Sequence, residues 1–201
     1  MIFLPGESLS EMPETEIARP LQLIGYFPRD VTVPSGWSIA AHVNEICSVS
    51  CCINSAPDGW IDHWLHNDLG FYNTRRDARN VLPTSPGSFA IYAYRLLPVR
   101  FSNGSTESFT TAAFPVEPLP SNFVSLGFDV VSKSVSAFFE CSPLSCNGMA
   151  AEVPVNQYCL IDTLEEAIAA AVRFSKEEPE PGPYYVVEVL REAESPSTMR
   201  P

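Results

Sequence analysis

The pattern of apolar positions predicts four β-strands. These strand-like runs are rich in aromatic and β-branched residues, which favour extended backbone. They occur at residues 21–27, 89–101, 123–132 and 184–190. Two prolines should affect them. Pro28 is expected to push the chain into a turn or into extended structure after the first strand, and Pro98 to bend or end the second.

The clearest helix is predicted after Asp162-Thr163, whose side chains can cap its first turn. Apolar residues then recur at spacings of three and four between Leu164 and Phe174, as an amphipathic helix requires. A shorter helix is expected after Asn73-Thr74. Residues 157–161 have the composition of a short buried strand.

The order of these elements occurs twice along the chain. The matching positions are Gly25 with Gly127, the Cys47–Cys51 loop with the Cys141–Cys146 loop, Asn67 with Asn156, and Ala78 with Ala167. We therefore predict an α+β fold made of two diverged repeats of a β–Cys loop–β–α–β unit. Its sheets should be mixed or antiparallel, and its helices few and short.

This interpretation divides the chain into five parts. We expect a flexible acidic arm at 1–20, the first repeat at 21–101, a Pro-containing linker at 102–122, the second repeat at 123–191 and a disordered tail at 192–201.

The charge balance narrows the choice of partner. The chain has 201 residues, with 24 acidic and 12 basic side chains, for a net charge of −12. Such a surface repels phosphate backbones, so we expect no nucleic-acid partner. It suits a basic protein partner, or it serves only solubility. No apolar run is long enough to span a membrane, and the N-terminus lacks a basic signal region. We therefore expect a soluble cytoplasmic protein with reduced cysteines.

The two cysteine loops are the first candidates for chemistry. If they met, Cys47, Cys51, Cys141 and Cys146 would supply four thiolates for a structural zinc ion. Their spacings are x3 and x4 rather than the usual x2, so no metal or other cofactor is favoured. Packing of these cysteines as small buried groups is the simpler interpretation. A reactive thiol is a further alternative, and it requires a lowered pKa.

Histidine is scarce, which limits the possible nucleophilic pairs. A Cys–His pair would need Cys47 or Cys51 beside His63 or His66. No motif supports that pairing.

Several other residues are candidates for contacts or for structure. Trp60 and Trp64 are core residues or, if exposed, a binding hot spot. Asn67 and Asn156 are expected to pin turns through their side chains. The helix exit bears a group of carboxylates that forms either a solvated end or an acidic surface for a basic partner: Glu177, Glu178 and Glu180.

Two short strings have the look of fixed signatures. Residues 140–147 read ECSPLSCN and residues 180–184 read EPGPY. They resemble signatures found in small bacterial proteins, but they point to no named family and carry no activity.

Motifs of known enzymes are missing from the sequence. There is no phosphate-binding glycine loop, nucleophile elbow, zinc-protease motif or dinucleotide fingerprint. This favours a non-enzyme. We predict an intracellular interaction protein of inhibitor or immunity type that binds a basic partner. The alternatives are a Cys/His thiol enzyme and a structural zinc protein.

Overall fold

A computed structural model gives the fold of most of the chain. It describes residues 20–30, 33, 39–50, 66–82, 89–110, 115–135 and 139–193. Residues 1–19 of the predicted arm, and the tail beyond residue 193, lie outside this part, as do the candidates Cys51, Trp60, His63 and Trp64.

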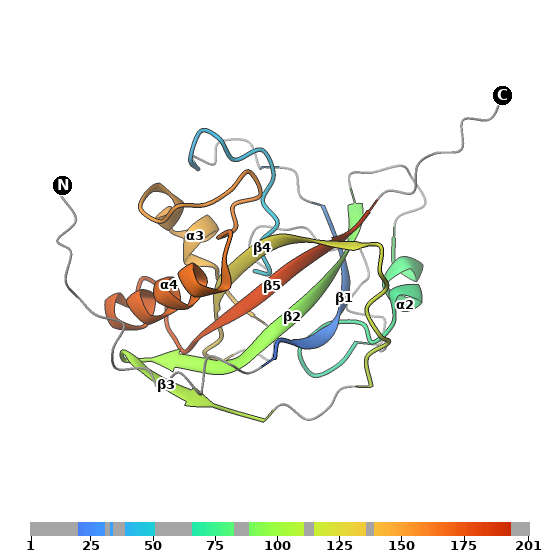
Figure 1. The fold of residues 1–201 in the computed structure, drawn as a ribbon, viewed down its shortest axis with the longest axis horizontal. Coiled ribbons are helices and arrows are strands. Elements are labelled where there is room, and N and C mark those ends of the chain that lie inside the picture. The colour runs from blue at the N-terminus through green and yellow to red at the C-terminus, as the bar shows by residue number, and fades with distance from the viewer. Residues whose placement is uncertain are drawn as a thin grey trace.

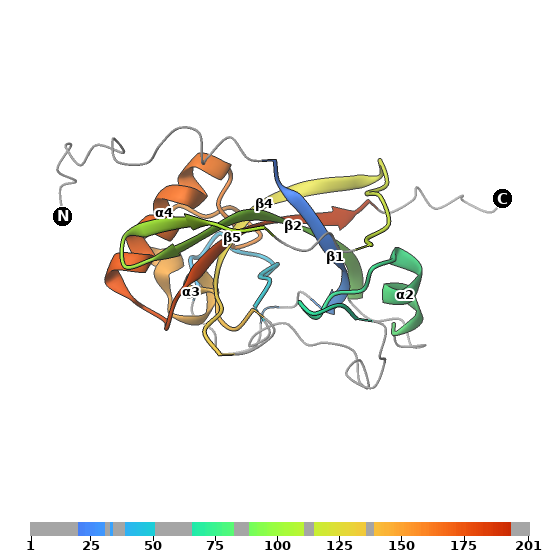
Figure 2. The ribbon, with the colours of Figure 1, turned by 90° about the horizontal axis from the view of Figure 1, so that it is seen from below.

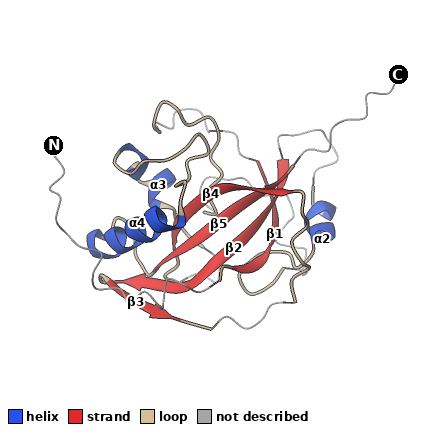
Figure 3. Cartoon of the chain, viewed as in Figure 1, coloured by secondary structure: helices blue, strands red, loops and turns tan. Residues whose placement is uncertain are grey.

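The described residues form one antiparallel sheet with short helices around it (Figures 1 and 3). The sheet order is β1-β2-β5-β4, and β3 pairs with the end of β2. The strands are β1 (Gln22–Asp30), β2 (Phe89–Ser102), β3 (Ser105–Ser108), β4 (Phe123–Ser132) and β5 (Tyr184–Glu192). The predicted α+β class with an antiparallel sheet and few short helices is confirmed.

The chain at Pro28 takes the extended one of the two expected arrangements, whereas Pro98 does not end its strand. Pro28 lies inside β1, opposite Ile91. It is tolerated because β1 is an outer strand, where a missing N–H costs no ladder bond on its free side. The second strand continues past Pro98 to Ser102, but its pairing with β5 shifts register between Leu96 and Arg100.

Two other segments also differ from expectation. The predicted linker contains β3, which folds back on β2 through Asn103-Gly104, both with positive φ (51° and 72°). Two successive residues of that conformation make the tight turn that joins antiparallel strands. Residues 157–161 form a turn rather than a strand, and only Ile161 makes a bridge, to Phe128 in β4.

Both predicted helices are present, with the predicted threonine caps. In α4 (Leu164–Glu177) the Glu166 N–H donates to the Thr163 hydroxyl at 3.2 Å. In α2 (Arg75–Asn80) the Asp77 N–H donates to the Thr74 hydroxyl at 3.1 Å. The second cysteine loop, predicted to be irregular, contains α3 (Pro143–Cys146) and is followed by the 3-10 turn η2 (Met149–Ala151).

The sheet is covered differently on its two faces. The helix α4 buries Ile168, Ala171 and Phe174 in an apolar cluster that includes Val130 and Val186 of the sheet. Side chains alternate along a strand, so the neighbours of Val130 on β4 point to the other face. There the cover is irregular chain, chiefly residues 44–50, which we call the strap, together with α3 (Figure 2). Residues 46–50 of the strap are all buried.

Candidate functional site

The two cysteine loops meet beneath the sheet. The Ser50 hydroxyl of the first loop donates to the Glu140 carbonyl at 2.8 Å and lies 3.6 Å from the Cys146 sulfur. Both loops also hold the same carboxylate, because Ser48 and Ser142 each donate a hydrogen bond to Asp129. Segments about ninety residues apart in sequence are therefore joined at one point.

Asp129 is the acidic half of this junction. It is fully buried on β4 and accepts from the Ser48 hydroxyl and the Val49 N–H at 2.8 Å each, and from the Ser142 hydroxyl at 2.6 Å. Burial raises the pKa of Asp129, and these hydrogen bonds oppose that rise. The carboxylate thus ties the strap to the N-terminus of α3.

Arg29 is the basic half. Its guanidinium donates to the Val49 carbonyl at 2.8 Å, the Ser50 carbonyl at 3.0 Å and the Tyr94 hydroxyl at 2.9 Å. It also lies 5.0 Å from the centre of the Phe27 ring, a cation–π contact. Asp129 therefore accepts from a backbone N–H of the strap, and Arg29 donates to two backbone carbonyls of the strap. We call this arrangement the charge clamp.

The buried cysteines are not activated. The Cys47 sulfur lies 3.8 Å from both the Tyr92 hydroxyl and the Glu45 carboxylate. Burial raises the pKa of Cys47 to about 12, and burial does the same to Cys159. Both thiols are therefore protonated near neutral pH, whereas a nucleophile or metal ligand is a thiolate.

The remaining thiols and His66 were also candidates. Cys141 and Cys146 are partly buried, and like Cys47 and Cys159 they are thiols that form no disulfide. In the described ranges, no group of three His, Cys, Asp or Glu residues is arranged to hold a metal ion. His66 is half-buried, and its backbone bridges Tyr72 beside the Asn67 turn.

The predicted acidic residues lie at the end of α4. Glu177 is exposed and pairs with Arg173 one turn earlier at 2.9 Å. Glu178 is exposed and ends the helix in the left-handed conformation, with φ of 50°. Glu180 is half-buried, and its backbone N–H and carbonyl both contact the Tyr184 hydroxyl.

The two signature-like strings lie side by side. The Asn147 side chain of the first donates to the Pro179 carbonyl, just before the second, at 2.8 Å. The Pro183 carbonyl accepts from the Lys133 N–H at 3.1 Å, and Ser132 next to it pairs with Glu140 and Cys141. The segment between α4 and β5 is therefore anchored beside the second cysteine loop, which the first string contains.

The two asparagines pin turns as predicted, and they do so with the same bonds. Asn67 accepts from the Leu69 and Phe71 N–H groups and donates to the Ile24 carbonyl and the Asn73 side chain. Asn156 makes the corresponding contacts, which are with Tyr158, Leu160, Leu126 and Asp162. Each turn then bridges an outer strand, through Tyr72 to Tyr26 and through Ile161 to Phe128.

Glycines with positive φ make room for these turns. Gly25 has φ of 140° and Gly127 has φ of 130°. A Cβ atom on Gly25 would lie 2.6 Å from the Phe71 Cβ, and one on Gly127 would lie 2.7 Å from the Ile161 carbonyl oxygen. Only glycine permits both the conformation and the close approach.

Sequence reasoning missed both members of the charge clamp. A signal was present for Asp129, which is the single charge in an otherwise apolar strand pattern, whereas Arg29 is followed by Asp30 and lies beyond the strand predicted at 21–27. A charge at such a position is either exposed on an outer strand or buried and paired. The partners here are backbone groups and serine hydroxyls of an irregular segment, which no pattern in the sequence identifies.

Comparisons of the chain with known families, sequences and structures found no match. No protein-family model matches the chain, and no curated protein sequence or solved structure matches it. Within the described part of the chain, none of the helices has the length and apolar character needed to cross a lipid bilayer.

Proposed function

We propose that this is an interaction protein, of inhibitor or immunity type, that binds a basic protein partner through carboxylates on α4. The observation that carries the proposal is the distribution of charge between the interior and the surface. Asp162, Glu165 and Glu166 are exposed at the start of the helix, and Glu177 and Glu178 at its end. Of these, only Glu177 forms an ion pair with a described basic residue.

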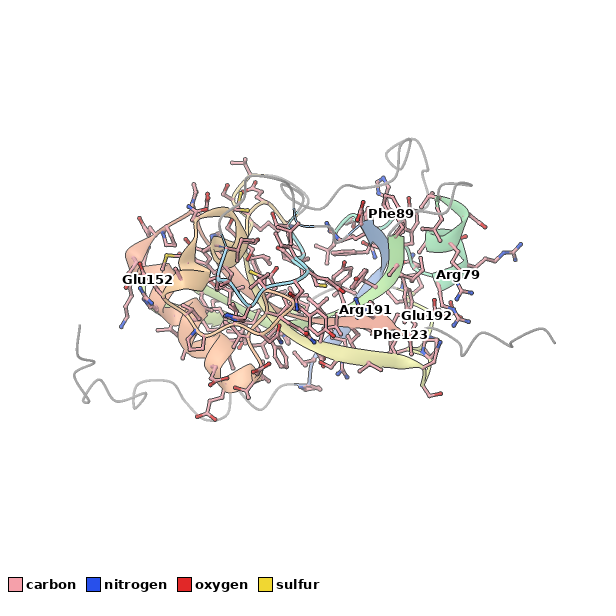
Figure 4. The ribbon with its side chains drawn as sticks, turned by 90° about the horizontal axis from the view of Figure 1, so that it is seen from above. Arg79, Phe89, Phe123, Glu152, Arg191 and Glu192 are labelled. Carbon is pink, nitrogen blue, oxygen red and sulfur yellow. The ribbon has the colours of Figure 1, made fainter. Side chains whose placement is uncertain are left out.

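The basic side chains are mostly engaged within the molecule. Six arginines form ion pairs with glutamates: Arg75, Arg79, Arg95, Arg100, Arg173 and Arg191. Figure 4 shows Arg79 beside Glu192, a pair 2.6 Å apart, at one end of the molecule, and Glu152, which pairs with Arg173, at the other. Internal pairing of the cations leaves the excess of carboxylates facing solvent, and a field of one sign steers an oppositely charged partner.

The state of the thiols supports binding rather than thiol catalysis. Cys47 and Cys159 are buried and have pKa values raised to about 12. Catalytic cysteines have the opposite properties, a lowered pKa and partial exposure. We include a cytoplasmic location in the proposal, because the described cysteines form no disulfide and a reducing compartment keeps thiols in that state.

The test uses a ten-residue lysine peptide as the basic probe and compares variants with the same net charge. Glu165→Gln with Glu178→Gln removes two exposed carboxylates of α4. Asp68→Asn with Asp77→Asn removes two carboxylates near α2, at the opposite end of the sheet, of which Asp68 is exposed and Asp77 is half-buried. If exposed charges contribute about 0.5 kcal/mol each, the α4 variant should bind about five times more weakly, and the α2 variant should bind like the wild type.

Two further measurements complete this test. Glu165→Asp with Glu178→Asp keeps the charge and should restore binding, and wild-type affinity should fall as sodium chloride rises from 50 to 300 mM. Binding that ignores salt, or that falls equally in the α4 and α2 variants, would contradict a partner site on α4.

We also propose that the fold arose from two diverged copies of one unit. The matching Asn turns, positive-φ glycines and threonine caps support this, because they occur in the same order in both halves. The sheet order β1-β2-β5-β4 fits it too, with β2 and β5 in corresponding central places. In this proposal the two cysteine loops correspond as well. An experimental structure in which the backbones of residues 22–102 and 123–192 fail to superimpose at these turns would refute the duplication.

A further inference from the structure

The most buried arginine in the described part of the chain is one without a carboxylate partner. The six arginines that pair with glutamates have side chains that are 27–49% exposed. Arg29 is only 6% exposed, and no ion pair joins it to a described carboxylate. A guanidinium withdrawn from water normally needs a counter-charge, so this exception requires an explanation.

Hydrogen bonds to described residues use only part of the donor capacity of Arg29. A guanidinium has five N–H groups. Three donate, to Tyr94, Val49 and Ser50, and all three acceptors are neutral oxygens. The Tyr94 hydroxyl accepts from Arg29, so its own proton remains available, and burial raises the pKa of Tyr94 to about 12, which keeps that proton in place.

Asp129 does not fill the role of direct counter-ion. Its two carboxylate oxygens accept from Ser48, Val49 and Ser142. Asp129 and Arg29 instead hold opposite sides of the strap, the acid at the Val49 N–H and the base at the Val49 carbonyl. Among the described residues, no carboxylate contacts the Arg29 guanidinium, and neutral oxygens hold its positive charge in place.

We propose that Arg29 and Tyr94 form a buried site for a small oxyanion, the phosphate or carboxylate group of a ligand. The planar guanidinium matches the paired oxygens of such groups, and the tyrosine O–H supplies a third donor. The Phe27 ring, 5.0 Å away, helps to fix the plane of the guanidinium. A bound anion also stabilises the strap that Arg29 holds. The inference is independent of the acidic partner surface, which would repel an anion.

The test is an anion titration of the full chain by NMR and thermal unfolding. Sodium phosphate and sodium acetate are compared with sodium chloride at equal ionic strength. We expect a saturable shift of the Arg29 Nε–H resonance and a saturable rise of several degrees in Tm with at least one oxyanion, because a ligand that binds only the folded state raises stability by mass action. Which oxyanion binds more tightly distinguishes a phosphate ligand from a carboxylate ligand.

Variants locate the site. Tyr94→Phe keeps the ring and removes one donor, so it should fold and bind the oxyanion about tenfold more weakly. Arg29→Lys keeps the charge but loses the paired geometry, and it should abolish the saturable shift in Tm. Arg76→Gln changes an exposed arginine on α2 and should bind like the wild type. The proposal is overturned if chloride reproduces the effect of both oxyanions, if Tyr94→Phe binds as tightly as the wild type, or if Arg76→Gln abolishes binding.

Discussion

Alanine at Gly127 tests the physical basis of the pinned turns most directly. The added Cβ would lie 2.7 Å from the Ile161 carbonyl oxygen and 3.0 Å from the Asn156 amide nitrogen, with φ at 130°. A backbone oxygen cannot rotate away, so the bridge between Phe128 and Ile161 must open. Its two hydrogen bonds are 2.8 and 2.9 Å long.

The expected cost has two parts. A non-glycine residue at a strongly positive φ costs about 1–3 kcal/mol. Two weakened buried hydrogen bonds contribute about 1 kcal/mol each. We therefore expect Gly127→Ala to lower the free energy of unfolding by about 3–5 kcal/mol. For a chain of this size that corresponds to about 6–20 °C in Tm.

Urea unfolding, followed by circular dichroism, measures this loss against a matched control. Gly148 also has a positive φ, 72°, but nothing lies within 4 Å of the Cβ that alanine would add. Gly148→Ala should therefore cost only about 1–2 kcal/mol, the strain of the left-handed conformation. Gly25→Ala, with its 2.6 Å contact, should resemble Gly127→Ala. If the Gly127 and Gly148 variants are equally stable, close packing does not determine the choice of glycine.

Three further outcomes are expected. Asn67→Ala and Asn156→Ala should each cost about 2–4 kcal/mol in urea unfolding, since each removes four hydrogen bonds; a loss under 1 kcal/mol would contradict their role. Cys47 and Cys159 should resist iodoacetamide at pH 8 until denaturant is added, because burial raises both pKa values to about 12. Peptide mapping measures the labelling, and rapid labelling of the folded protein would contradict this expectation. Burial alone would raise the pKa of Glu192, but hydrogen bonds from Arg79 and Asn122 and the nearby positive charges lower it overall. Glu192→Gln should therefore cost about 1 kcal/mol at pH 7. The difference from wild type should shrink as pH falls below the ordinary pKa of 4.5, and it should vanish only below the lowered pKa of the folded state. A difference that stays constant with pH would refute the linkage.

Local patterns in the sequence predict the elements of this fold well. The strands at 123–132 and 184–190 and the helix after Thr163 follow from apolar spacing and a capping side chain, which act within a few residues. Asn67 and Asn156 were identified as turn-pinning residues for the same reason. Local signals do not reveal long-range pairing. Pro28 is compatible with a strand only because β1 is an outer strand, which depends on the whole sheet.

The candidate site was harder to predict than the fold. The contact between the two cysteine loops depends on Asp129, whose partners Ser48 and Ser142 are far from each other in sequence. Serines in loops are common, and nothing distinguishes these two before the chain is folded. The spacing of the cysteines suggested that sulfur would join the two loops. The hydrogen bonds that join them are made mainly by serine hydroxyls, backbone groups and the Asp129 carboxylate.

The pinned turns also affect how the sheet meets other chains. An outer strand normally presents unpaired N–H and carbonyl groups on which a foreign strand can assemble. Here Tyr26 on β1 and Phe128 on β4 already exchange both backbone hydrogen bonds with Tyr72 and Ile161. Each turn therefore pairs with backbone groups in the middle of an outer strand, so that a strand of another chain cannot pair there. We expect this pairing to protect the sheet against edge-to-edge aggregation.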